Sequence, residues 1–320
     1  MKIVILDGNA ANPGDLSWEW LKPLVDEITI YDVTPPELVV ERSKGAQILT
    51  TNKVVFTREI IEQLPECRFI QVLATGYNVV DTEAAREHGI TVSNIPAYST
   101  DGVAQLVFAL LLELANNVGL HAKSVADGEW AACRQFCYWK TPLAELAGKT
   151  FGIFGFGKIG STVAQIANAF KMNVIAYSPH TRSYDGFGKV EFVTKDELIK
   201  RSDVLSLHCP LTPETTGLVN ADFISGMKRG AWLINTSRGP VLDEQAVADA
   251  LEDGRLGGLG ADVLIQEPPK DGSPLIGAKN CFLTPHIAWA SFEARTRLMN
   301  IFKSNLRAFL EGKPENVVNL

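Results

Sequence analysis

Residues 150–160, TFGIFGFGKIG, decide the fold of the larger part of this chain. A short apolar run leads directly into Gly155, Gly157 and Gly160, and residues 161–170, STVAQIANAF, continue as a helix. In such a strand–turn–helix unit the first glycine permits a tight turn, the second lets a pyrophosphate approach the backbone, and the third lets helix and strand pack closely. The start of the helix offers N–H groups and a positive dipole end to phosphates. The pattern therefore predicts a dinucleotide-binding turn, with an ordinary glycine-rich turn as the alternative.

The sequence on both sides of this turn alternates between β-rich runs and helical stretches. Such alternation is typical of βαβ units, whose strands form a parallel sheet. Thr194 and Glu197 form a capping box at the start of one helix, and Gly254 ends another that begins at Asp243. We therefore predict an α/β protein with two doubly wound parallel sheets. The predicted strands are Lys2–Leu6, Ile28–Tyr31, Ala46–Thr50, Phe69–Ala74, Thr150–Phe154, Asn173–Tyr177, Asp203–Leu207, Ala231–Asn235, Gly258–Val263 and Cys281–Thr284.

The length of the chain and the order of its elements indicate two domains. At 320 residues the chain is about twice the size of a typical domain. The last predicted helix, from Ser291 to Leu310, follows the completed second sheet and is free to return to the first domain. We expect a discontinuous substrate-binding domain of residues 1–99 plus 290–320 and an inserted dinucleotide-binding domain of residues 100–289.

Composition excludes several classes of protein. The 30 basic and 37 acidic residues give a net charge of −7, which argues against binding nucleic acid through its phosphates. The five cysteines are odd in number and form no CxxC pair, so neither a disulfide framework nor a zinc site is expected, and we predict no metal. No stretch is long and apolar enough for a signal peptide or a membrane span. We expect a cytoplasmic protein without a membrane partner.

The segment after Ser99 differs from the rest of the chain in its hydrophobic pattern. Ser99 or Thr100 can cap one long helix reaching residue 128, and its apolar residues cover more than one face. Such a helix usually packs against two domains or against a second subunit. The following segment, EWAACRQFCYWKTP at 129–142, is rich in aromatic residues without a clear period. It is either an ordered excursion that covers another surface or a buried loop.

The end of the second Rossmann strand departs from the usual pattern. Ser178 stands where an Asp or Glu would bind the ribose hydroxyls of NAD. A carboxylate would repel the 2′-phosphate of NADP, whereas a serine does not. We expect His180 and Arg182, which follow the serine, to pair with that phosphate. The sequence predicts NADP or NAD as the cofactor, with NADP preferred. The alternative is a surface loop with incidental charges.

Three polar residues follow strands of the second half at the edge where parallel sheets bind ligands. Arg238 follows Ala231–Asn235, Glu267 follows Asp262, and His286 follows Cys281–Thr284. Singly, each is more simply explained as a salt-bridge arginine, a solvated acid or a buried histidine. Together they fit the reduction of a 2-oxo acid.

The chemistry of that reduction accounts for each residue type. Arg238 would hold the substrate carboxylate through two parallel hydrogen bonds. His286 would protonate the developing alkoxide near neutral pH. Glu267 would stabilise the protonated imidazole and keep the acid form available.

The chain resembles the D-isomer-specific 2-hydroxyacid dehydrogenases over essentially its whole length. Seven segments carry the resemblance in order. Within the family the sequence is most similar to glycerate dehydrogenases, also called hydroxypyruvate reductases, in its segments 74–78, 136–139 and 284–290. The seven segments are 72–81, 94–105, 155–160, 208–215, 235–243, 262–268 and 284–289.

The resemblance implies a flavodoxin-like substrate domain, a Rossmann dinucleotide-binding domain and a homodimer built on the helix at 99–119. It implies that backbone groups of Ala74, Thr75 and Gly76 help to bind the substrate carboxylate. Gln105 replaces a common glutamate of the family, and Ser178 replaces the acidic ribose ligand. The implied cofactor contacts beyond the glycines are Lys158, Ile159, Cys209, Pro210, Thr215, Thr236, Ser237 and Asp262, the last near the carboxamide.

The implied activity is hydride transfer between a nicotinamide cofactor and a small D-2-hydroxy or 2-oxo acid. The favoured reactions reduce hydroxypyruvate to D-glycerate and glyoxylate to glycolate, and Phe136, Tyr138 and Trp139 are a candidate wall for a small pocket. Dehydrogenases of the D-lactate or 3-phosphoglycerate type are alternatives. The second of these would need an arginine cluster in the first domain, where Asn52-Lys53 offers one cation. A dinucleotide-binding corepressor scaffold is the alternative from another class of protein.

Overall fold

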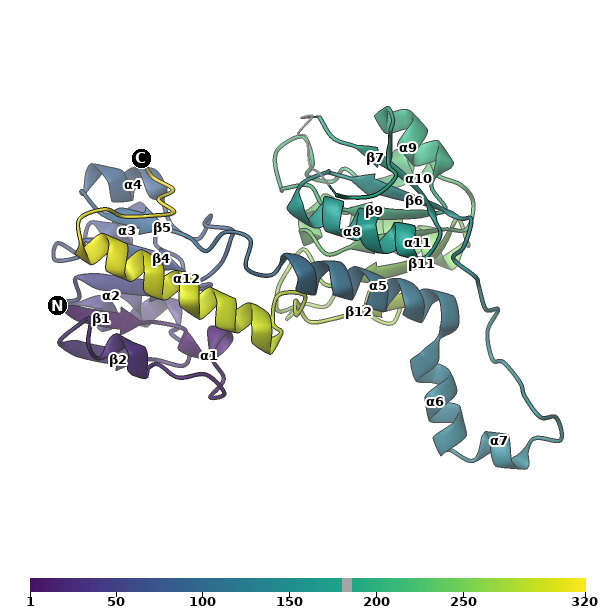
Figure 1. Cartoon of the computed structure of the whole chain (residues 1–320), viewed down its shortest axis with the longest axis horizontal. Helices are drawn as coiled ribbons and strands as arrows, with labels where there is room; N and C mark the ends of the chain where they lie inside the picture. The colour runs from purple at the N-terminus through teal and green to yellow at the C-terminus, as the bar shows by residue number, and fades with distance from the viewer. Residues whose placement is uncertain (180–185) are drawn as a thin grey trace. The chain divides into compact units, whose positions relative to one another are not determined.

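The computed structural model describes residues 1–179 and 186–320, and the chain divides into two compact units. Unit 1 comprises Met1–Ser99 and Trp289–Leu320, and unit 2 comprises Thr100–Ala288. The second boundary therefore lies one residue before the predicted position. The yellow C-terminal helix shares a unit with the purple N-terminal strands in Figure 1.

Unit 1 contains a five-stranded sheet with the order β2-β1-β3-β4-β5. All paired strands are parallel, and this is the strand order of flavodoxin-like folds. The strands are β1 Lys2–Ile5, β2 Glu27–Ile30, β3 Ile48–Thr51, β4 Phe69–Val72 and β5 Thr91–Ser93. The α-helices are α1 Gly8–Ala11, α2 Val39–Ser43, α3 Arg58–Ile61, α4 Thr82–Glu87 and α12 Phe292–Leu310, with short 3-10 turns at Glu19–Leu21 and Pro36–Leu38.

Both faces of this sheet are covered by helices. Ile3 and Ile5 of β1 pack in one core with Phe302 of α12. Val4, which points to the opposite face, packs with Ile61 of α3. Because successive side chains of a strand alternate between faces, the nearly continuous apolar run of β1 fits a sheet that is buried on both sides.

Unit 2 contains a seven-stranded parallel sheet with the order β12-β11-β10-β9-β6-β7-β8. The order reverses between β6 and β9, and ligands of open α/β sheets bind outside the carboxyl ends of strands at such a switch point. The strands are β6 Thr150–Phe154, β7 Asn173–Tyr177, β8 Glu191–Phe192, β9 Val204–Leu207, β10 Ala231–Asn235, β11 Leu256–Ala261 and β12 Cys281–Leu283. The α-helices are α5 Thr100–Asn116, α6 Val118–Ala126, α7 Glu129–Ala132, α8 Lys158–Ala169, α9 Lys195–Arg201, α10 Ala221–Gly226 and α11 Glu244–Glu252, with a 3-10 turn at Gly239–Val241.

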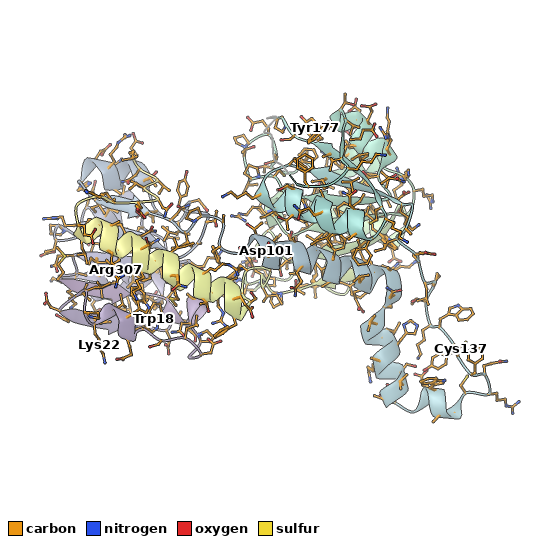
Figure 2. The ribbon with its side chains drawn as sticks, viewed as in Figure 1. Trp18, Lys22, Asp101, Cys137, Tyr177 and Arg307 are labelled. Carbon is orange, nitrogen blue, oxygen red and sulfur yellow. The ribbon has the colours of Figure 1, made fainter. Side chains whose placement is uncertain are left out.

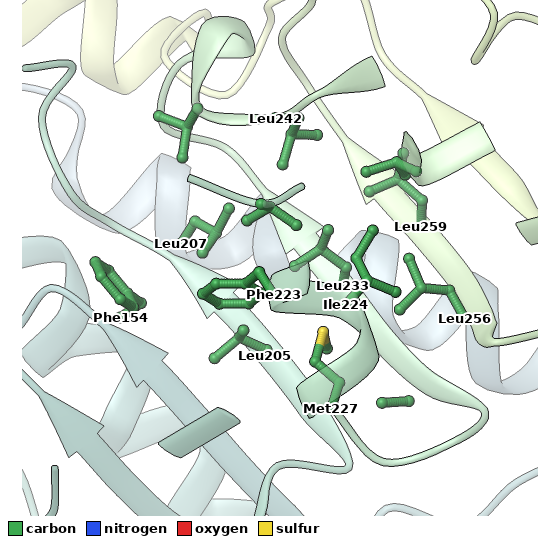
Figure 3. Packing of buried hydrophobic residues seen from close by; sticks show 14 of the residues in the cluster. Phe154, Leu205, Leu207, Phe223, Ile224, Met227, Leu233, Leu242, Leu256 and Leu259 are labelled. Atoms are coloured by element: carbon green, nitrogen blue, oxygen red, sulfur yellow. The ribbon is translucent and has the colours of Figure 1, made fainter. Parts of the chain in front are cut away.

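The two faces of the second sheet also have separate cores. On one face Phe108 of α5 stacks on Phe151 and on Phe170. On the other face, Phe223 and Ile224 of α10 pack against the strands, as Figure 3 shows. This architecture confirms the predicted pair of doubly wound parallel sheets.

Two local predictions from capping are confirmed. The Thr194 hydroxyl and the Glu197 carboxylate form the reciprocal bonds of a capping box at α9. Asp243 caps α11 by accepting a hydrogen bond from the Ala246 N–H. By contrast β5 and β8, which have three and two residues, were not predicted, because edge strands this short carry little apolar pattern.

The long helix predicted from Ser99 to residue 128 is wrong, because the structure contains two helices there. Asn117 adopts a left-handed conformation with φ of 46°, which asparagine tolerates better than most residues, and the axis bends by 60° between α5 and α6. Among the described residues no single helix is long and apolar enough to cross a membrane, although α5 and α6 pass that test as a bent pair.

Residues 118–143, which we call the arm, extend from the sheet of unit 2, with Cys137 near the far end (Figures 1 and 2). The Tyr138 hydroxyl lies 2.6 Å from the Ser124 hydroxyl, which ties the returning chain to α6. Phe136 and Trp139 are 88% and 67% exposed, so the alternative of a buried loop does not describe this segment.

Candidate active site

The glycine-rich turn connects β6 to α8 at the switch point of the second sheet. Gly155 has φ of +98°, and a Cβ built on it would lie 2.7 Å from the His208 carbonyl oxygen. A Cβ on Gly160 would lie 2.5 Å from the Gly155 carbonyl oxygen. A Cβ on Gly157, however, would meet no protein atom within 4 Å. Two of the glycines thus serve packing within the protein, while Gly157 leaves its backbone open to a ligand.

The start of α8 retains capacity for an anion. Gly157 is its N-cap and supplies no side-chain hydrogen bond to the first turn, which contains Lys158 and Ile159. The N–H groups of a first helical turn have no partner within the helix, and their dipoles favour negative charge. Both properties suit the pyrophosphate of a dinucleotide.

The loop after β9 forms the other side of the switch point. Its His208 N–H donates to the Phe154 carbonyl, and its ring Nε2 lies 2.9 Å from the Ser206 hydroxyl. Burial lowers the pKa of His208 to about 4, so the ring is neutral at physiological pH. Burial also raises the pKa of the Cys209 thiol to about 11. The Thr215 hydroxyl holds the same loop by donating to the Pro210 carbonyl at 2.7 Å.

Asn235, at the end of β10, shapes the turn that carries Arg238. Its Oδ1 accepts bonds from the Ser237 N–H at 3.0 Å and hydroxyl at 2.8 Å, and its Nδ2 donates to the Arg238 carbonyl at 2.9 Å. The Thr236 hydroxyl oxygen is buried and has no hydrogen-bond partner. Since buried polar atoms are normally satisfied, this hydroxyl is available to a ligand.

His286 and Glu267 form a direct pair. The His286 Nδ1 lies 2.6 Å from Glu267 Oε2, and Glu267 Oε1 accepts a bond from the Leu264 N–H at 3.0 Å. With Nδ1 held in this way, Nε2 is the ring nitrogen that can meet a substrate. His286 itself has a left-handed backbone with φ of 53°, and its N–H donates to the Asp262 carbonyl at 2.9 Å.

The Asp262 carboxylate fixes the turn around His286. It accepts bonds from the Thr284 hydroxyl at 2.5 Å and from the N–H groups of Ile287 and Ala288, each at 2.8 Å. Burial raises the pKa of Asp262, and these hydrogen bonds oppose that rise. Because a carboxylate offers about four acceptor positions, one remains for a further donor such as a carboxamide.

The substrate-binding residues expected in unit 1 follow β4. The Thr75 hydroxyl donates to the Ile95 carbonyl, and the Ala74 carbonyl accepts from the Ile95 N–H. The turn after the neighbouring strand β3 is held by the buried Asp7, whose carboxylate accepts hydrogen bonds from the N–H groups of Asn52 at 2.8 Å and Lys53 at 2.6 Å.

The structure brings Arg238, Asp262, Glu267 and His286 onto neighbouring loops of unit 2, whereas Ala74, Thr75 and Gly76 lie in unit 1. Ser178 directly follows β7, whose last residue, Tyr177, is labelled in Figure 2. His180 and Arg182 lie outside the described residues.

Sequence reasoning missed two supporting residues, Asn235 and Glu244. Asn235 has a recognisable signal, since it is a polar residue at the end of an apolar strand. In the sequence, Glu244 resembles any acidic residue in the first turn of a helix. Only the folded structure shows that its side chain is buried.

The chain is similar to known proteins over its whole length. The family model described as "D-isomer specific 2-hydroxyacid dehydrogenase, NAD binding domain" matches residues 108–288. The chain is 48% identical over 322 residues to a hydroxypyruvate reductase of Blautia hydrogenotrophica, covering 100% of both chains. It is 44% identical to a glycerate dehydrogenase of Methylorubrum extorquens, covering 88% of both. A solved acyclic imino acid reductase in complex with NADPH and D-Arg is 33% identical, with a TM-score of 0.86 and coverage of 99% of this chain and 100% of that chain.

Proposed function

Because the chain belongs to the family of D-isomer specific 2-hydroxyacid dehydrogenases, we propose that it reduces hydroxypyruvate to D-glycerate and glyoxylate to glycolate. The observation that carries this proposal is the pair of His286 Nδ1 and Glu267 Oε2 at 2.6 Å. A carboxylate on one ring nitrogen stabilises the protonated imidazole and directs the other nitrogen toward a substrate. Names of the relatives support the choice of substrate.

The residues present fit a nicotinamide dinucleotide. The open backbone at Gly157 would admit the pyrophosphate of the cofactor. The buried Thr236 hydroxyl would form a hydrogen bond with the cofactor, and Asp262 would accept a hydrogen bond from its carboxamide. When bound, this cofactor supplies the hydride that the carbonyl carbon of the substrate receives.

The chain's own residues would supply binding and proton transfer. Arg238 would hold the substrate carboxylate through its guanidinium, assisted by backbone groups of Ala74, Thr75 and Gly76. His286 would donate the proton on Nε2 to the carbonyl oxygen as negative charge develops there. Glu267 would keep the ring oriented and compensate its positive charge.

Substitution of His286 and Arg238 tests this assignment. We expect His286→Ala and Arg238→Ala each to lower kcat/KM for hydroxypyruvate by about 10²–10⁴-fold, the usual contribution of general acid catalysis. Dinucleotide binding, followed by fluorescence titration, should survive in both variants. His88→Ala is the matched control, because His88 is an exposed histidine at the C-cap of α4 in unit 1. A His286→Ala enzyme with the wild-type rate would refute the proposal.

We also propose that NADPH is preferred over NADH. Ser178 removes the carboxylate that would repel a 2′-phosphate, and each charge-assisted contact to the phosphate would add roughly 1.5–3 kcal/mol, about ten- to a hundredfold in affinity. Kinetics with both cofactors should show the preference in the wild type and its reversal in Ser178→Asp. An enzyme that is faster with NADH and unaffected by Arg182→Ala would contradict this preference.

We propose that the protein is a homodimer, with the arm as part of the interface. Trp130, Phe136 and Trp139 are large, exposed and close in sequence, and exposed apolar groups of this kind mark interaction surfaces. Sedimentation of the full chain should give twice the monomer mass, and Phe136→Ser with Trp139→Ser should shift it toward monomer.

The same aromatic segment suggests the size of the substrate. With Phe136, Tyr138 and Trp139 reaching across the proposed dimer as one wall of a small polar pocket, hydroxypyruvate and glyoxylate should be reduced far better than 2-oxo acids with bulky side chains. A higher kcat/KM for phenylpyruvate would contradict this choice of substrate.

A further inference from the structure

The peptide between Leu264 and Ile265 lies where two parts of the proposed site meet. Its own N–H, that of Ile265, donates to Glu244 Oε1 at 2.7 Å, and the N–H of Leu264 donates to Glu267 Oε1 at 3.0 Å. A Cβ built on Gly239 would overlap the Leu264 carbonyl group, so the turn after Arg238 packs flat on the same peptide.

Glu244 is the residue that fixes this peptide to the body of unit 2. It is the first residue of α11, and only 8% of its surface is exposed. Its second carboxylate oxygen, Oε2, accepts a bond from the Ser273 hydroxyl at 2.7 Å, and Ser273 Oγ also accepts from the N–H of the buried Leu275. One buried side chain thus holds both ends of the loop that carries Glu267.

A buried carboxylate is costly, so its partners indicate what it does. Each oxygen of Glu244 accepts from a donor of the 264–275 loop, and α11 is anchored independently through Val247 and Leu251, which are buried in the core. The helix therefore provides a rigid support, and the two hydrogen bonds of Glu244 fix the loop relative to this helix. Side chains around an active site that lock the reacting groups within a fraction of an ångström have this arrangement.

We infer that Glu244 is a positioning residue of the proposed reaction, which holds Glu267 against His286 by fixing the Leu264–Ile265 peptide. This inference rests on the proposed function. The same peptide packs against Gly239 and so also fixes the position of the turn that carries Arg238. The same peptide would then position both the proton donor, His286, and the carboxylate-binding group, Arg238, although 48 residues separate them in the sequence.

The consequence of losing Glu244 follows from the charges around His286. Among the described residues, Glu267 Oε2 lies 2.6 Å from the ring, and the charge of His286 acts to lower the pKa of Asp262. Asp262 is held by its own three hydrogen bonds and would stay in place. A loosened Glu267 would stabilise the protonated ring less, so the fall of the reduction rate at high pH would begin at lower pH.

The test compares Glu244→Ala, Glu244→Gln and Ser273→Ala. We expect Glu244→Ala to lower kcat for hydroxypyruvate about 10- to 100-fold, as misplacement of reacting groups does, and to move the basic limb of the pH profile to lower pH. Glu244→Gln should retain most of the activity, because its amide oxygen still accepts from Ile265 and its NH₂ can donate to Ser273 Oγ. Ser273→Ala, which removes one of the two bonds, should act in the same direction with a smaller change.

Asp243→Ala is the matched control, because it removes the cap of the same helix without touching the loop. It should lower Tm while leaving the pH profile in place. Histidine NMR adds a measurement that needs no turnover: the Nδ1–H resonance of His286, assigned through His286→Ala, should be displaced downfield by the 2.6 Å contact with Glu267 in the wild type and should lose that displacement in Glu244→Ala.

The outcomes separate this inference from the proposed function. Loss of activity in His286→Ala together with an unchanged kcat, pH limb and Nδ1–H resonance of His286 in Glu244→Ala would overturn the positioning role alone. Glu244→Gln as impaired as Glu244→Ala would also overturn it. A fully active His286→Ala would instead overturn the proposed function, while the NMR comparison would still decide whether Glu244 positions Glu267.

Discussion

The three glycines of the turn after β6 should fail in different ways when each is replaced by alanine. In Gly157→Ala the added methyl meets no protein atom within 4 Å, and φ at this residue is −104°, which alanine adopts freely. Alanine is a poorer N-cap than glycine but restricts the unfolded chain, and the two effects nearly cancel. We therefore expect the free energy of unfolding to change by less than about 1 kcal/mol.

The other two glycines are constrained by the protein itself. Gly155→Ala combines a φ of +98° with a methyl 2.7 Å from the His208 carbonyl oxygen. Backbone strain of about 1–2 kcal/mol and overpacking of about 1–3 kcal/mol give a loss of roughly 3 kcal/mol. For a unit of this size that lowers Tm by about 6–12 °C. Gly160→Ala, whose methyl would lie 2.5 Å from the Gly155 carbonyl oxygen, should lose about 1–3 kcal/mol.

Of the three substitutions, only Gly157→Ala should weaken dinucleotide binding without lowering the stability of the fold. A methyl on the open side of the turn would displace the pyrophosphate and weaken one or two charge-assisted bonds, raising Kd about ten- to a hundredfold. Thermal unfolding followed by circular dichroism and titration of NADPH or NADH by fluorescence measure the two effects separately. Normal binding by Gly157→Ala, or a Tm as low as that of Gly155→Ala, would refute this account of the turn.

Three further predictions concern ionisable groups. Glu267→Gln should move the basic limb of hydroxypyruvate reduction to lower pH, and an unmoved pH–rate profile would contradict the role of its charge. The pKa of His208 is lowered to about 4, so the unfolded chain binds its proton first as pH falls below 6.5, and stability falls by about 2.5 kcal/mol between pH 7 and 4.5. In His208→Asn, urea unfolding should show that fall reduced by this amount. Burial raises the pKa of Cys67 to about 12 and of Cys209 to about 11, so iodoacetamide at pH 8 should label the exposed Cys137 first, as mass spectrometry would show.

The positions of most strands and their alternation with helices could be predicted because their signals are local. The turn at Gly155 follows an apolar run, and polar residues such as Asn235 and Asp262 mark where strands end. Alternation of strands and helices leaves few possible topologies for a parallel sheet. The break at Asn117 could not be predicted, because the apolar pattern continues on both sides of it and the left-handed turn leaves no mark in that pattern.

The sequence by itself determined the class of fold, the glycine-rich turn between β6 and α8, and the residue types that the proposed 2-oxo acid reduction needs. These features depend on periodicity, on glycine spacing and on chemical identity, all of which are written along the chain. Only the tertiary structure decided that Glu267 meets Nδ1 of His286, that Asp262 holds the histidine's turn, and that Glu244 is buried beneath the loop. Hydrogen bonds between loops depend on sheet register and on the path of each loop, so partners that lie about 20 residues apart in sequence become neighbours only when the sheet has formed.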